Sequence, residues 1–292
     1  MPASDHDVHL ADGRTLRVLE EGDAHGRPIF FLHGTPGSRL LHEAQVEDAR
    51  RRGIRLIAYD RPGYGGSTPM PGRDIANGAT DVLAIADTLG LDRFAVYGHS
   101  GGGPHALACA TLPPERVVAV TAVASPAPFP AEGLDWFEGQ GKENVAELSA
   151  ALKGPTELER FLAPQRPGLL SATPEAVVAS FGSLLPRIDS RILRKELAAF
   201  FGAEAREGLR EGIAGWRDDD LAFTRPWGFE ISSVRVPTQI WQGGQDRMVP
   251  FAHGTWLATR LPQADIHLEP KEGHLSLFGR FPLIHEWLFA HF

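Results

Sequence analysis

The stretch that decides the fold is FAVYGHSGGG (residues 94–103), in which an apolar run ends in a serine flanked by glycines. Gly98 and Gly102 lie two positions before and after Ser100. The apolar residues 94–99 predict a buried strand, and the following GGPHALACATL predicts a helix. A sharp turn from strand to helix brings the two backbones close together, so only small residues fit beside the serine. We therefore expect the Ser100 hydroxyl to project above a sheet, at the N-terminus of the helix.

Similar short apolar runs recur along the chain and alternate with helix-like segments. The expected strands are 28–34, 54–60, 94–100, 117–125, 237–244 and 264–270, and the expected helices are 38–52, 74–90, 102–112, 250–262 and 279–291. Near-continuous apolar strands are typical of a parallel sheet covered on both faces. Residues 7–21 predict an antiparallel hairpin that turns at Asp12 and Gly13. The alternation predicts an α/β fold with a doubly wound, mostly parallel sheet.

The alternation stops between about Pro126 and Val236, where helical patterns occur without a clear strand. This stretch is too rich in aromatic residues for a disordered linker. We expect residues 126–230 to form an inserted helical lid, and residues 1–125 and 231–292 to form the core. Some aromatic side chains of the insertion would line an apolar substrate pocket, and the candidates are Trp136, Phe137, Trp216 and Phe223.

A serine hydroxyl needs a base to act as a nucleophile at neutral pH, and two later loops supply candidates. His274 lies in KEGHLSLF, a loop between the expected strand 264–270 and the last helix. Asp246 lies in WQGGQDRMVP, after the strand that ends near Trp241, and would fix the tautomer of the histidine. Loops at the carboxyl ends of parallel strands gather at one edge of the sheet. The order Ser100, Asp246, His274 is the one expected for a catalytic triad in this architecture.

Other acids and histidines remain alternatives. On a purely structural interpretation, Asp246 is a turn residue that caps the next helix. Asp135 and the run Asp218 to Asp220 lie in the insertion, where an acidic run is usually a solvated face. The remaining late histidines are expected to be structural (His253, His267) or at the surface of the last helix (His285, His291).

An acyl-transfer site also needs donors for the developing oxyanion. The sequence LHGTPGS follows the expected strand 28–34, and its glycines permit tight turns that aim backbone N–H groups inward. We expect one donor to be the N–H of Gly101, directly after the serine, and the other to be the N–H of Thr35.

The motifs HGTPG, DRPGYGGS, GHSGGG, GGQDRMVP and EGHLSL, in this order, resemble those of the α/β-hydrolase superfamily. The resemblance implies the α/β-hydrolase fold and a serine–histidine–aspartate triad. Relatives with the HGxPG pattern include proline iminopeptidases, esterases, lactonases and cofactor-free haloperoxidases. Epoxide hydrolases and haloalkane dehalogenases are similar too, but they have aspartate where this chain has Ser100, which disfavours their reactions.

The expected function is that of a serine hydrolase acting on an ester, a lactone or a related small acyl compound through an acyl-enzyme, with no metal and no organic cofactor. The alternatives are a proline iminopeptidase-like aminopeptidase, a ligand receptor on the same scaffold, and a tailoring enzyme. An aminopeptidase of that kind would need carboxylates from the insertion to hold the amino terminus of the substrate. The acids available there are Glu143, Glu147 and Asp218 to Asp220.

The composition limits the partners and the cellular location. A net charge of -8 gives no sign of a nucleic-acid-binding surface. No apolar run approaches the roughly 20 residues of a membrane span, and the start MPASDHDVHLADGR has no signal-peptide pattern. Cys109, the single cysteine, excludes an internal disulfide and a cysteine-based metal cluster. We expect a cytoplasmic protein whose partner is a small-molecule acyl substrate, with the oligomeric state left open.

Overall fold

A computed structural model describes residues 3–292, with Lys195 described by its backbone alone. Within these residues one 8-stranded sheet has the order β1-β2-β4-β3-β5-β6-β7-β8. Strand β2 is antiparallel to β1 and β4, and all other pairs are parallel. The doubly wound, mostly parallel sheet is therefore confirmed. The strands are β1 (Ser4–His9), β2 (Thr15–Gly22), β3 (Arg27–Leu32), β4 (Ile54–Tyr59), β5 (Phe94–His99), β6 (Val117–Val123), β7 (Thr238–Gly243) and β8 (Asp265–Glu269).

The register of the central strands aligns their carboxyl ends. Gly98 of β5 pairs with Leu32 of β3 on one side and with Ala122 of β6 on the other. Ala122 in turn pairs with Ile240 of β7. The loops that follow these strands therefore begin at the same edge of the sheet, which is where an open α/β sheet binds ligands.

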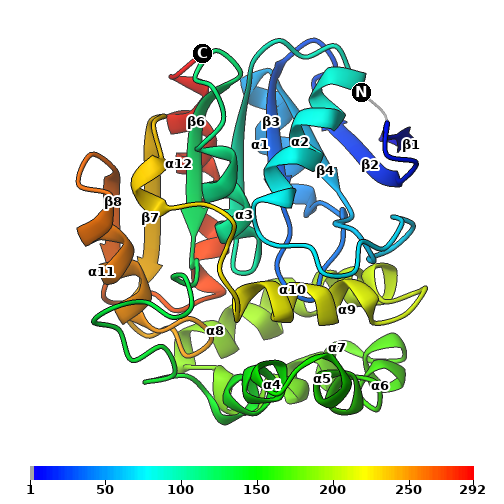
Figure 1. The fold of residues 1–292 in the computed structure, drawn as a ribbon, viewed down its shortest axis with the longest axis vertical. Helices are drawn as coiled ribbons and strands as arrows, with labels where there is room; N and C mark the ends of the chain where they lie inside the picture. Colours follow the sequence, from blue (N-terminus) through cyan, green and yellow to red (C-terminus); the bar gives the residue numbers. More distant parts are fainter. Residues whose placement is uncertain (1–2) are drawn as a thin grey trace.

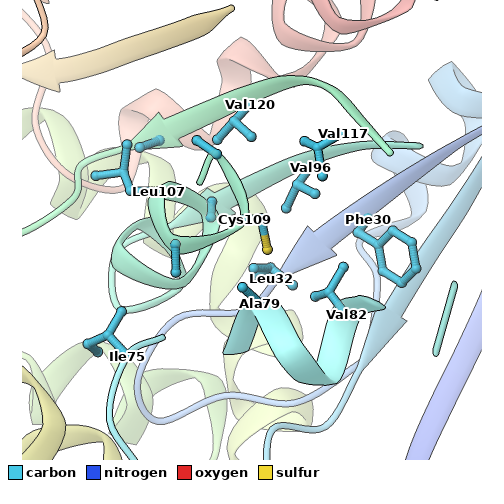
Figure 2. Packing of buried hydrophobic residues seen from close by; sticks show 14 of the residues in the cluster. Phe30, Leu32, Ile75, Ala79, Val82, Val96, Leu107, Cys109, Val117 and Val120 are labelled. Atoms are coloured by element: carbon cyan, nitrogen blue, oxygen red, sulfur yellow. The ribbon is translucent and has the colours of Figure 1, made fainter. Parts of the chain in front are cut away.

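Helices cover both faces of the sheet (Figure 1). One buried cluster holds Val82, Leu107 and Ile240, and the other holds Phe31, Leu56 and Leu288. Figure 2 shows the first cluster, in which the buried thiol of Cys109 points toward Leu32 and Ala79. Each fully buried aliphatic side chain of this kind contributes about 1.5–3 kcal/mol of transfer free energy. The covering helices are α1 (Glu43–Arg52), α2 (Asn77–Thr88), α3 (Gly102–Cys109), α11 (Phe251–Arg260) and α12 (Phe281–Phe289).

The chain between β6 and β7 is helical, and the described structure places no strand there. Its helices form a separate layer across the carboxyl ends of the strands (Figure 1). We call residues 126–230 the helical insertion; these boundaries, and a role as a lid, remain predictions. Its helices are α4 (Lys142–Leu152), α5 (Pro155–Leu162), α6 (Arg166–Leu170), α7 (Pro174–Ser180), α8 (Arg187–Ile192), α9 (Ala198–Gly208) and α10 (Ala214–Phe223).

Candidate active site

Ser100 lies in a strained turn between β5 and α3. Its φ of 55° is in the left-handed region that side chains other than glycine rarely adopt, and its N–H donates to Val123 O over 2.8 Å. A Cβ atom on Gly98 would lie 2.1 Å from the oxygen of Gly102, and one on Gly102 would lie 2.0 Å from that of Leu32. The turn therefore requires both glycines, as the sequence predicts for a nucleophile elbow.

His274 and Asp246 form a buried pair in the loops after β8 and β7. The Nδ1 atom of His274 lies 2.7 Å from Oδ2 of Asp246. The other carboxylate oxygen of Asp246 accepts the backbone N–H groups of Met248 and Val249, each over 2.8 Å. Because the carboxylate can only accept, the hydrogen-bond network assigns the His274 proton to Nδ1 and leaves Nε2 free to act as a base.

Ser100 and His274 line the same cavity, which has a volume of about 740 Å³. The described residues include no hydrogen bond between the Ser100 hydroxyl and His274. Such bonds are often long in a free enzyme and shorten when substrate binds. The structure thus brings the three residues of the predicted triad to one edge of the sheet, and their catalytic roles remain a proposal.

His99 supports the loop that carries His274. Its Nε2 donates to the carbonyl oxygen of His274 over 3.1 Å, and the two rings pack edge to face with their centres 4.9 Å apart. Burial, with the nearby charge of His274, lowers the pKa of His99 to about 3. His99 is therefore neutral at physiological pH and holds the backbone of His274 in place.

Thr35 and Gly101 approach each other beside Ser100. A Cβ atom on Gly101 would lie 2.2 Å from Oγ1 of Thr35, so this approach requires glycine. In the described part of the chain, no acceptor binds the backbone N–H of Thr35 or of Gly101. Both residues line a cavity of about 70 Å³ together with Ser100. Two unpaired donors at this place fit the predicted oxyanion hole.

A buried ion pair holds the loop that carries Thr35. Arg61 donates to the backbone oxygens of His33 and Gly34, and it pairs with Asp219 of the insertion over 2.6 Å. The hydroxyl of Thr35 also donates to Asp219, over 2.6 Å. Burial alone would raise the pKa of Asp219, but Arg61 and Arg73 hold it well below its usual range. Asp219 therefore fixes, from the insertion, the loop that carries Thr35.

The expectation that the run Asp218 to Asp220 is a solvated face is wrong. Asp218, Asp219 and Asp220 are only 2%, 0% and 2% exposed. Arginines that lie far away in the sequence, Arg61 and Arg73, neutralise the charge of Asp219, and this allows α10 to be buried.

Asp219→Asn is expected to lower the free energy of unfolding by about 3–5 kcal/mol, because it leaves two buried guanidinium groups without their partner. Urea unfolding followed by circular dichroism measures this change. Asp87→Asn, which breaks a part-exposed pair with Arg116, is the control and should cost about 1 kcal/mol or less. Equal effects of the two substitutions would contradict the role of Asp219 as a structural anchor.

Asp189 of α8 is a second link between the insertion and the site, and no motif or spacing in the sequence indicates it. Its carboxylate accepts the backbone N–H of His274 over 2.7 Å, of Leu275 over 3.1 Å and of Ser276 over 2.9 Å. A Cβ atom on Gly273 would lie 2.4 Å from the same carboxylate. Asp189 therefore fixes the backbone on both sides of the His274 side chain.

The predicted aromatic lining is found in part. Trp136 and Phe223 line the smaller cavity, and Trp216 lines the larger one. Phe137 lines neither of these two cavities; it packs on Phe129 and Trp136, with ring centres 6.3 and 5.3 Å apart. Sequence reasoning did not single out the other aromatic residues of the larger cavity, which are Phe31, Phe161, Phe181, Phe201 and Phe278.

The model of the family described as the alpha/beta hydrolase fold matches residues 27–281. The chain belongs to this family. An AB hydrolase superfamily protein of Bacillus subtilis (strain 168), YisY, is 28% identical over 283 residues, which cover 94% of this chain and 93% of that protein. A bifunctional esterase/perhydrolase of Acinetobacter calcoaceticus is 28% identical over 259 residues, which cover 84% of this chain and 83% of that protein. Family and relatives together support a hydrolytic role.

Solved structures of the family share the fold. The enol-lactonase from Burkholderia xenovorans LB400 matches with a TM-score of 0.71 at 18% identity and covers 98% of this chain and 100% of its own. A thermophilic esterase from Thermogutta terrifontis matches with a TM-score of 0.70 at 21% identity, over 99% of this chain and 100% of its own. Within residues 3–292, no helix is both long enough and apolar enough to cross a membrane.

Proposed function

We propose that this member of the alpha/beta hydrolase family is a serine hydrolase that cleaves an ester, a lactone or a related small acyl compound. One observation carries the proposal: Ser100, in its strained turn, lines the same cavity as His274, whose Nδ1 lies 2.7 Å from Asp246. A serine with a base and an orienting acid is the arrangement that nucleophilic acyl transfer needs.

The geometry supports a two-step reaction. The Ser100 oxygen attacks the substrate carbonyl carbon while Nε2 of His274 takes the hydroxyl proton. The carbonyl oxygen becomes an oxyanion that accepts the N–H groups of Thr35 and Gly101. When the bond to the leaving group breaks, His274 gives its proton to that group. A water molecule then attacks the carbonyl carbon of the acyl-serine while His274 takes one of its protons. The bond between the acyl group and the Ser100 oxygen breaks, the acid is released, and His274 returns the proton to Ser100.

The lining of the larger cavity supports an apolar substrate group. Aromatic and aliphatic side chains form most of its wall, and Phe161, Phe181 and Leu184 are among them. Cavities of this kind bind ligands mainly by burying apolar surface, while a few polar groups fix the orientation. One relative is named as an esterase/perhydrolase, and one solved structure with the same fold is named as an enol-lactonase. Esters and lactones are both within the proposed substrate class.

A fluorophosphonate probe tests the nucleophile, and p-nitrophenyl acetate tests turnover. We expect covalent labelling of the protein at Ser100, found by peptide mass spectrometry, together with steady release of p-nitrophenol. Labelling of Ser100 without turnover of any ester or lactone in a panel would instead favour a ligand receptor on the same scaffold. Turnover with no label on Ser100 would overturn the assignment of the nucleophile.

The pH dependence of the rate follows from His274. Burial would lower the pKa of its ring, but the charge and the hydrogen bond of Asp246, with a smaller contribution from Asp189, raise it above the ordinary value of 6.5. Since the neutral ring is the base, kcat/KM should rise with pH through one ionisation whose midpoint lies above that value. A profile of kcat/KM between about pH 5 and pH 9 measures it. A midpoint below the ordinary value would contradict this assignment.

Asp189→Asn should lower kcat by about 10- to 100-fold, because small displacements of catalytic groups have effects of this size. The loss of its charge should also move the midpoint of the pH profile down, since that charge helps to raise the pKa of His274. Asp135→Asn, on an exposed residue of the insertion, is the matched control. A lower kcat with an unchanged midpoint would limit Asp189 to a structural role.

A further inference from the structure

The smaller cavity adjoins the nucleophile and receives two carboxyl groups from the insertion. Glu147 of α4 and Asp220 of α10 line it together with Ser100 and Gly101. Asp220 is only 2% exposed. The sequence left open whether acids of the insertion face the site, and these two do. His274 lines only the larger of the two cavities.

Each donating side-chain nitrogen around the smaller cavity has one acceptor within the protein, so the carboxamides of Gln140 and Asn144 each keep one further N–H. Acceptors are the more numerous free groups there, because the carboxyl groups of Glu147 and Asp220 line the cavity and Oε1 of Gln140 has no partner among the described residues. A ligand group that donates hydrogen bonds matches such a wall, whereas a ligand that only accepts them does not. The occupied donors are Trp136 Nε1 (to Ala127 O, 2.8 Å), Gln140 Nε2 (to Trp136 O, 2.9 Å), Asn144 Nδ2 (to Met248 O, 3.1 Å) and His253 Nε2 (to Trp136 O, 3.0 Å).

Asp220 differs from its two neighbours in lacking a cation. Asp218 pairs with Arg217 over 2.9 Å, and Asp219 pairs with Arg61 over 2.6 Å. In the part of the chain that the structure describes, no N–H or O–H group donates to the Asp220 carboxyl, and its one polar partner is the carboxyl of Glu147. Arg73, whose charge acts on Asp220, is itself paired with Asp219.

Asp220 is buried and Glu147 is half-buried, and two neighbouring carboxyl groups in such a place are not readily both ionised without a counter-charge. Burial raises the pKa of both groups, and the charge of Glu147 raises that of Asp220 further. The pair therefore binds a proton more tightly than an isolated carboxyl group does. A cationic group placed between them would replace that proton and pair with both carboxylates.

The position of His274 assigns the two cavities to the two parts of a substrate. The leaving group must receive its proton from His274, so it occupies the larger cavity, which His274 lines. The acyl part then enters the smaller cavity beside Gly101, whose volume of about 70 Å³ admits only a compact group.

We propose that the smaller cavity is a subsite for the ammonium group of a compact acyl moiety, held by Asp220 and Glu147, while a bulky apolar leaving group fills the larger cavity. This inference rests on the proposed function, because the division into acyl and leaving groups assumes Ser100 and His274 in their catalytic roles.

The test compares two p-nitrobenzyl esters of the same shape, the 3-aminopropanoate and the butanoate, in which an ammonium group replaces a methyl group. We expect the native protein to prefer the 3-aminopropanoate in kcat/KM by about tenfold or more, since hydrogen bonds to charged groups have free energies of this order. Equal rates, or a preference for the butanoate, would overturn the proposal.

Variants connect the preference to the two carboxyls. Asp220→Asn should remove the preference by lowering kcat/KM for the 3-aminopropanoate about tenfold more than kcat/KM for the butanoate, because only the ammonium group pairs with the carboxylate. Glu147→Gln, which can still accept the hydrogen bond from Trp216, should reduce the preference in the same direction. Asp135→Asn, on an exposed residue that lines neither cavity, should keep it. A preference that survives both cavity substitutions would overturn the proposal.

The same preference on the leaving-group side would overturn the assignment of the cavities. The butanoate ester of 2-(trimethylammonio)ethanol and its uncharged counterpart, 3,3-dimethylbutyl butanoate, test this side. Aromatic and aliphatic side chains form most of the larger cavity, but Glu143, Glu147 and Glu204 line it too, with Lys142. We therefore expect a smaller advantage from the charge there than on the acyl side, and one that Asp220→Asn leaves unchanged, because Asp220 lines the smaller cavity and not the larger one.

A binding experiment separates failure of this inference from failure of the proposed function. Propylammonium chloride is titrated into the protein and followed by tryptophan fluorescence, with 1-propanol as the uncharged control. Saturable binding that Asp220→Asn abolishes supports the subsite even if no ester is hydrolysed and Ser100 is not labelled. Absence of saturable binding to the native protein would overturn the subsite, whatever the esterase assays show.

Discussion

Ser100→Ala is expected to leave the fold intact and to lower ester turnover by about 10⁴-fold or more, because the members of a triad act as a unit. The Ser100 hydroxyl makes no hydrogen bond among the described residues, so its removal costs the folded state little. The measurements are kcat/KM for p-nitrophenyl acetate and the melting temperature. A variant with more than about a tenth of native turnover would rule out Ser100 as the nucleophile.

A matched serine substitution controls for the loss of a hydroxyl as such. Ser232 is exposed and lines neither cavity, so Ser232→Ala should keep both turnover and fluorophosphonate labelling. Labelling of the Ser100→Ala protein at another residue would show that a different nucleophile reacts with the probe.

Asp246→Asn should lower turnover by roughly 10⁴-fold while the protein stays folded. Met248 and Val249 donate their N–H groups to one carboxylate oxygen, so the amide oxygen of an asparagine would take that place. Its NH₂ group would then face Nδ1 of His274 and force the ring proton onto Nε2. The ring could no longer accept the proton of Ser100.

The melting temperature distinguishes this loss from simple unfolding. Asp219 is the contrasting acid, since it belongs to the insertion and anchors the loop that carries Thr35. A folded Asp219→Asn protein without activity, next to an active Asp246→Asn protein, would move the acid of the triad into the insertion and contradict the proposed role of Asp246.

Local patterns in the sequence predict the sheet well, and they single out Ser100 and His274, which the structure places at one cavity. Each of the expected strands lies within about two residues of an observed one, because continuous apolar runs fit only a sheet buried on both faces. Ser100 and His274 are recognisable for a related reason: glycines at fixed spacing reveal the backbone turns that carry them.

Features that depend on distant contacts escape a sequence analysis. The helix expected over 38–52 begins only at Glu43, because Arg39 is held in an irregular segment by Asp5 and Asp60. His285, expected at the surface, is fully buried and contacts Asp48 and Tyr97.

Three acids of the insertion also depend on contacts with distant parts of the chain. The partners of Asp189, Glu147 and Asp220 lie in loops and helices far away in the chain, so no local spacing predicts these contacts. Composition alone makes such residues look like solvated charges. Their environment decides whether they anchor a loop, face a nucleophile or remain at the surface.

The anchoring of the insertion at Asp189 and Asp219 restricts how the chain can be recombined. One carboxylate holds the backbone around His274, and the other holds Thr35 through its hydroxyl. A chimera that exchanges residues 126–230 for the corresponding segment of a relative would lose both anchors unless aspartates occupied the same positions. A chimera built on the core of this chain should therefore retain α8 and α10. The reverse chimera, with this segment on the core of a relative, should carry Arg61 and Arg73 as well.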